Sequence, residues 1–149
     1  MDDLERHRRL LAKVPLFAGV PPSELSDLAG RCVERRYPSG RALFNEGDEG
    51  SGLLVLVRGS VSLDRALPRG ESLHVAVLGA GEPLGEMALL DGHRRSVTAT
   101  ALEECTALSL SREEFLHAAR GSFDLSLAVM QGLSARLRKA TRRLGAPRP

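Results

Sequence analysis

The feature that most constrains the fold is the punctuation of residues 32–110, where glycine, proline, asparagine and aspartate recur every few residues between short β-rich runs. Short strands at regular spacing, bounded by turn-forming residues, are typical of an all-β barrel, roll or sandwich. We expect strands at residues 32–37, 42–45, 53–58, 61–64, 73–78, 97–101 and 105–110.

Both ends of the chain carry helical patterns instead. Apolar residues at helical spacing and the Pro-Pro-Ser sequence at 21–23 predict two short helices within residues 4–31. Ser111 and Glu114 have the spacing of a capping box, in which the hydroxyl and the carboxylate satisfy amides at the first turn. That helix is expected to end at Gly121, and Ser122 is placed to cap the next one.

The last helix is expected to run for about twenty residues with one apolar seam at steps of three and four. We expect the start of this seam to pack on the β body and the remainder to pair with a second copy in a homodimer. The seam consists of Phe123, Ser126, Met130, Leu133, Leu137, Ala140 and Leu144.

Charge and composition exclude several classes of protein. Lys and Arg number 21 against 19 Asp and Glu, so the net charge of +2 does not by itself indicate a nucleic-acid or membrane partner. The basic excess lies in residues 120–149, which makes a basic C-terminal arm on a mildly acidic body. Two cysteines cannot form a disulfide framework, and no apolar run is long enough to cross a membrane. We expect a cytoplasmic protein with no membrane segment.

The glycine-rich segment 79–85 follows a strand-like run and superficially matches a dinucleotide-binding turn. That interpretation needs a helix of several turns after the glycines and a parallel strand beyond it. Pro83 interrupts the start, and Asp91-Gly92 ends any helix within two turns of Gly85. We therefore discard a dinucleotide site.

Residues 84–97 fit a different site, one for a ribose phosphate. A glycine followed by one or two helical turns presents free backbone N–H groups to an anion. Arg95 can return to the same anion with charge and paired N–H donors, and Glu86 is then free to accept from a sugar hydroxyl. Ser96 adds a small hydroxyl beside them.

The sequence Gly-Glu-Met-Ala-Leu-Leu at 85–90, followed by Arg-Ser-Val-Thr-Ala at 95–99, resembles the phosphate-binding cassette of cyclic-nucleotide-binding domains. The family includes the bacterial catabolite activator protein and the regulatory subunits of protein kinase A. The resemblance extends over residues 11–144. It implies a mainly β fold with flanking α-helices, a double-stranded β-helix described as a jelly-roll-like β-roll, with short N-terminal helices and a long C-terminal helix.

The resemblance also implies site roles. Glu86 would bind the ribose 2′-hydroxyl and Arg95 the cyclic phosphate, while Ser96 would contact the phosphate or the base. Thr141 is expected to contact adenine from the last helix. The complete expected ligand-binding set is Leu84, Gly85, Glu86, Met87, Ala88, Arg95, Ser96 and Thr141, with Leu84 beside the sugar and backbone donors from 85, 87 and 88.

One domain, 1–149, is expected: a helical entry (1–31), a β-roll (32–110) containing the cassette (84–97), C-terminal helices (111–144) and a tail (145–149). Bacterial transcription factors of this family continue into a helix-turn-helix, and this sequence stops before one, so we expect no DNA-binding domain. An aromatic that the family often carries is replaced here by Leu53 or Leu54, a change expected to affect packing only.

The leading hypothesis is a non-catalytic sensor of cyclic AMP (cAMP) rather than cyclic GMP (cGMP). It has no other cofactor and signals by movement of its C-terminal helix to a second copy or to an effector protein. Two alternatives remain open: a ligand-free scaffold that binds a partner through its basic helix, and DNA binding through that arm. His74 and His93 lack partners at metal-ligand spacing, and Ser96 has no paired base, so neither a metal site nor an enzyme is expected.

Overall fold

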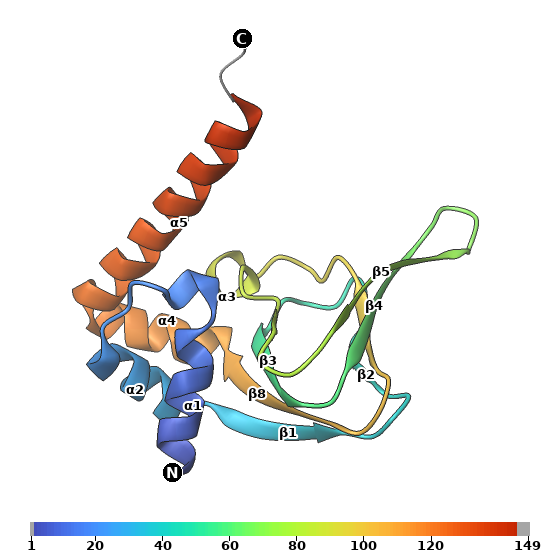
Figure 1. Ribbon diagram of the computed structural model, residues 1–149, viewed down its shortest axis with the longest axis horizontal. Helices are drawn as coiled ribbons and strands as arrows, with labels where there is room; N and C mark the ends of the chain where they lie inside the picture. Colours follow the sequence, from blue (N-terminus) through green and yellow to red (C-terminus); the bar gives the residue numbers. More distant parts are fainter. Residues whose placement is uncertain (1, 146–149) are drawn as a thin grey trace.

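The computed structural model describes residues 2–145, and its centre is a roll of two antiparallel four-stranded sheets (Figure 1). The strand orders are β1-β8-β3-β6 and β2-β7-β4-β5. The predicted jelly-roll-like β-roll with flanking helices is confirmed. The strands are β1 (Val33–Tyr37), β2 (Ala42–Phe44), β3 (Gly52–Arg58), β4 (Val61–Ala66), β5 (Ser72–Leu78), β6 (Pro83–Leu84), β7 (Thr98–Ala101) and β8 (Cys105–Ser111).

The aliphatic run in β3 is buried on both faces, which explains why it does not alternate with polar residues. Leu53 and Val55 face the core under the helices, whereas Leu54 and Leu56 face the inside of the roll. Successive side chains of a strand point to opposite sides. One strand therefore joins the two apolar cores, and it lies beside β6, where the cassette begins.

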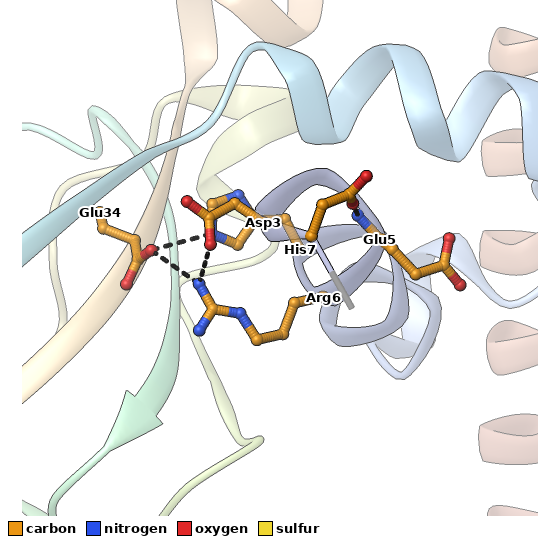
Figure 2. A network of polar contacts seen from close by, with 6 residues as sticks. Asp3, Glu5, Arg6, His7 and Glu34 are labelled. Carbon is orange, nitrogen blue, oxygen red and sulfur yellow. Dashed lines mark hydrogen bonds and ion pairs between the residues drawn. The ribbon is translucent and has the colours of Figure 1, made fainter.

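The N-terminal helices cover the outer side of the sheet that contains β1, β3 and β8 (Figure 1). They are α1 (Asp3–Ala12), the 3-10 helix η1 (Pro15–Phe17) and α2 (Pro22–Gly30). Figure 2 shows how α1 is tied to β1: the carboxylate of Glu34 accepts from Arg6 Nη2 at 3.3 Å and lies 3.1 Å from His7 Nε2. The Arg6 and Glu34 side chains are partly exposed, so this ion pair orients α1 more than it stabilises the fold.

Two helices follow the roll, α4 (Arg112–Gly121) and α5 (Phe123–Leu144), with the short α3 (Ala88–Asp91) inside the cassette. The predicted caps are present, since Ser111 accepts from Glu114 N and Ser122 accepts from Leu125 N. The reciprocal half of the capping box is not formed, because the Glu114 carboxylate binds Arg31 at 2.9 Å instead. Within residues 2–145, no helix combines the length and apolarity that a membrane crossing requires.

The stripe of α5 that packs on the body differs from the predicted seam. Leu125, Ala128 and Val129 are buried, whereas Phe123 and Met130 of the predicted seam are 70% and 52% exposed. The helix docks where Gly132 allows close approach, since a Cβ there would lie 3.3 Å from the carbonyl oxygen of Leu16 in η1. Beyond this crossing α5 extends away from the roll (Figure 1).

Candidate functional site

The cassette starts where β6 ends, at a backbone turn that requires glycine. Gly85 has a φ of 73°, in the left-handed region that side chains with a Cβ disfavour. A Cβ at this position would also lie 2.0 Å from Arg95 Nη1. The turn is closed by the amides of Ala88 and Leu89, which donate to the carbonyls of Gly85 and Glu86 at 3.1 and 3.2 Å. Gly85 thus brings the backbone directly against the guanidinium of Arg95.

Arg95 is buried without a carboxylate partner in the described part of the chain. Arg95 is 8% exposed, and its Nη2 donates to the carbonyl of Gly52 at 2.8 Å. Among residues 2–145, its Nε and Nη1 have no hydrogen-bond partner. The guanidinium carbon lies 4.4 Å from the centroid of the Phe44 ring. Burial lowers the pKa of Arg95, while Asp48 raises it. A buried cation with two unpartnered donor nitrogens is poised to receive an anion.

Arg95 and the cassette turn both line a cavity of about 240 Å³. Its wall includes Gly85, Met87, Ala88, Arg95 and Ser96, so the structure brings these five predicted residues together. Ser96 is exposed there, and Met87 is 44% exposed. The amide of Ala88, predicted to face the phosphate, is instead used within the turn.

Glu86 points to the helices instead of this cavity. Its Oε2 accepts from the backbone amide of Leu16 at 3.1 Å, and its Oε1 accepts from Arg136 Nη2 of α5 at 2.5 Å. Arg136 Nη1 also lies 3.3 Å from the sulfur of Met87. The structure thus separates Glu86 from Arg95, and both partners of the carboxylate come from elements outside the roll.

The other predicted residues lie at the margins. Leu84 is 3% exposed and packs into the core inside the roll, below the cassette. Thr141 lies on the exposed part of α5, where it lines an open groove formed with Ser134 and Leu137 of the same helix. The structure therefore does not bring Thr141 to the cavity, and its contact with a base stays a prediction.

Phe44, Leu16 and Arg136 contact the predicted site residues and were absent from the sequence-based set. Leu16 contributes only a main-chain amide, for which the sequence gives no signal. Arg136 was visible only as one of several bases in the C-terminal arm, and Phe44 only as the apolar residue of a short strand.

The chemistry that the buried Arg95 makes available is the binding of an anion. Across residues 2–145 no group of three or more His, Cys, Asp or Glu side chains is placed to hold a metal ion. The fold is a β-roll that carries a turn at Gly85, the buried Arg95 and the separate carboxylate of Glu86. These features are typical of a β-roll that binds a small ligand.

Comparison with known proteins identifies the family to which the chain belongs. The family model for the cyclic nucleotide-binding domain matches residues 34–121. The chain is 40% identical over 127 residues to the cyclic AMP receptor protein of Thermus thermophilus, covering 85% of this chain and 58% of that protein. It is 27% identical to the CRP-like cAMP-activated global transcriptional regulator of Mycobacterium tuberculosis, over 91% of this chain and 60% of that one. The chain belongs to the cyclic nucleotide-binding domain family.

Solved structures support the same assignment. The N-terminal domain of a transcriptional regulator from Streptomyces coelicolor matches with a TM-score of 0.82 and 33% identity, covering 88% of this chain and 94% of that one. The Thermus thermophilus catabolite activator protein matches with a TM-score of 0.69 and 37% identity, over 87% and 61% of the two chains. The chain spans about three fifths of the length of the curated relatives described above.

Proposed function

We propose that the protein is a non-catalytic, cytoplasmic receptor for a cyclic mononucleotide, cAMP rather than cGMP, that signals through α5. The observation that carries the proposal is the buried Arg95, whose Nε and Nη1 are unpartnered beside the turn at Gly85. The choice of cAMP is supported by the relatives named as a cyclic AMP receptor and as a cAMP-activated regulator.

The ligand's phosphate would provide what Arg95 lacks. A cyclic phosphate carries one negative charge and accepts hydrogen bonds from the free guanidinium nitrogens, which compensates the desolvation of the cation. The glycine at position 85 leaves room for Arg95 Nη1 against the backbone, so that the guanidinium can reach the phosphate from this position. Ser96, which lines the same cavity, would add a hydroxyl donor.

The ribose of the ligand would bind at Glu86, which is the other end of the cassette. A ribose 2′-hydroxyl that donates to Glu86 competes with Arg136 and with the amide of Leu16 for the same carboxylate. Losing Arg136 from this pair weakens a link between the cassette and α5. A ligand shifts a conformational equilibrium only through contacts that differ between the two states, and this exchange of partners is such a contact.

The partner of α5 in this proposal is a second copy of the chain. On the side of α5 that does not pack on the body, Met130, Leu137 and Leu144 are 52%, 69% and 84% exposed at seven-residue steps. Such a repeat forms a coiled-coil seam when two copies align. Sedimentation of wild type and Leu137→Glu tests this: a dimer that the charged variant converts to monomer supports it, and a monomeric wild type overturns it.

A thermal-shift experiment with cAMP, cGMP and 5′-AMP tests the receptor itself. A ligand at 100 times its Kd stabilises the folded protein by about 2.7 kcal/mol, which raises Tm by roughly 5–10 °C for a domain of this size. We expect the largest shift with cAMP and none with 5′-AMP. The absence of any shift with either cyclic nucleotide would instead favour a ligand-free scaffold.

A further inference from the structure

Within residues 2–145, Phe44 is the aromatic residue whose ring packs against the guanidinium of Arg95. The strand pairing explains why the ring lies at this position. Phe44 ends β2 opposite Ala99 of β7, after a register shift that follows Ala42. Ala99 is fully buried inside the roll, so its partner position also faces inward. The Arg95 segment leads directly into β7, which brings the guanidinium over the ring at 4.4 Å.

Two carboxylates also lie near Arg95 and Phe44. A second cavity, of about 350 Å³, is lined by Arg95, Phe44, Asp48 and Glu49. Neither acidic side chain is within ion-pair distance of Arg95 in the described structure, although Asp48 is close enough to raise the pKa of Arg95. The side chain of Asp48 instead accepts from the amide of Asn45 at 2.9 Å.

We infer that Phe44 is a positioning residue for ligand binding: its ring holds the Arg95 guanidinium on the cassette side and keeps it away from Asp48 and Glu49. This inference rests on the proposed function, because the group that Arg95 is held for is the ligand's phosphate. The ring acts through Arg95, and it also forms part of the wall of the 240 Å³ cavity, so the test below separates the two roles through Asp48.

An aromatic face suits this task better than a carboxylate. It attracts a cation electrostatically without using any of the guanidinium N–H groups. A carboxylate would occupy two of those donors and neutralise the charge, so the phosphate would have to displace it. Nη2 of Arg95 is fixed by the carbonyl of Gly52, and Nη1 faces the turn at Gly85. The Phe44 ring restrains the plane of the guanidinium group.

The test compares aromatic and aliphatic side chains at position 44. Phe44→Leu keeps an apolar group but removes the ring face, and we expect cAMP affinity measured by calorimetry to fall about tenfold. Phe44→Tyr keeps the ring and is expected to bind within about twofold of wild type. Adding Asp48→Asn to Phe44→Leu removes the negative charge that competes for the freed guanidinium, and should recover much of the lost affinity.

Tyr37→Leu is the matched control, because Tyr37 is another aromatic that packs on the core inside the roll and lines the second cavity. It should lower Tm while leaving affinity within about twofold, which separates a packing defect from a positioning defect. Equal affinity of Phe44→Leu and wild type, or equal weakness of Phe44→Tyr and Phe44→Leu, overturns the inference alone. A wild type that does not bind cAMP or cGMP overturns the proposed function, and this inference with it.

Discussion

Arg95 and Glu86 belong to the same cassette, and their surroundings differ in a way that bears on signalling. Arg95 is held by groups of the roll itself, the carbonyl of Gly52 and the ring of Phe44, and keeps two nitrogens unpartnered. Glu86 has both carboxylate oxygens engaged by groups outside the roll, on η1 and α5.

From this difference we assign separate roles to Arg95, at the phosphate end of the cassette, and to Glu86, at the sugar end. A preformed anion site adds affinity without rearrangement, because little is reorganised when the ligand arrives. A carboxylate that must exchange partners adds less affinity but transmits the binding event to the elements it releases. The phosphate end should therefore dominate binding, and the sugar end should dominate the response of α5.

Arg95→Leu should have the largest effect on binding. Hydrogen bonds to charged groups contribute roughly 1.5–3 kcal/mol each, so losing the guanidinium should weaken cAMP binding at least ~100-fold in calorimetry. Arg95→Lys should also bind poorly, since the charge remains but the planar set of donors is lost.

The thermal stability of Arg95→Leu gives a second test of the difference between Arg95 and Glu86. A buried charge without a carboxylate partner destabilises the folded state, so Arg95→Leu without ligand should melt no lower than wild type. Arg36→Leu is the control: Arg36 is exposed on β1, is not among the residues that line either cavity, and should change affinity little. Unchanged affinity in Arg95→Leu would show that the anion end is misassigned.

Gly85→Ala should have the next largest effect, about tenfold on affinity, because the new Cβ would displace Arg95 Nη1 from its position. The left-handed backbone also disfavours alanine by about 1–2 kcal/mol, which is read from Tm. Gly81→Ala isolates that backbone cost, since Gly81 has a φ of 87° and an added Cβ meets nothing within 4 Å. Equal affinity losses in the two variants would mean that displacement of Arg95 does not matter.

Arg136→Met should have the smallest effect on binding and the clearest effect on α5. The Arg136 side chain is 38% exposed, so its pair with Glu86 contributes at most about 1 kcal/mol, and freeing Glu86 should raise cAMP affinity about threefold. Backbone amides of residues 137–145 should exchange faster with deuterium, and we expect the same change in wild type when ligand binds. Arg138→Met serves as the control on the same helix, and identical exchange in both variants would contradict a role for the Glu86–Arg136 pair.

The sequence predicted the roll well because its signals are local. Turn residues bound each run, and the predicted strand at 53–58 corresponds to β3 (Gly52–Arg58) almost residue for residue. β6 was missed because it has two residues, begins with Pro83, and is a strand only through its pairing with Leu54 and Val55.

The candidate site was predicted unevenly for the same reason. Gly85, Met87, Ala88, Arg95 and Ser96 meet in one cavity because they are close in the chain and Gly85 admits the return of Arg95. The partners of Glu86 lie 70 and 50 residues away in Leu16 and Arg136, and only the docking of η1 and α5 on the roll brings them in. The buried face of α5 was misassigned because the apolar pattern of the helix includes both a packed and an exposed stripe.

The most direct test of a ligand held by its phosphate at Arg95 and by its sugar at Glu86 is a set of four calorimetric titrations. They use cAMP and 2′-deoxy-cAMP against wild type and Glu86→Gln. We predict that wild type loses roughly 10- to 100-fold in affinity when the 2′-hydroxyl is absent, whereas Glu86→Gln binds the two ligands nearly equally. A wild type that does not distinguish the ligands, or a Glu86→Gln variant that distinguishes them as strongly as wild type, would contradict this account.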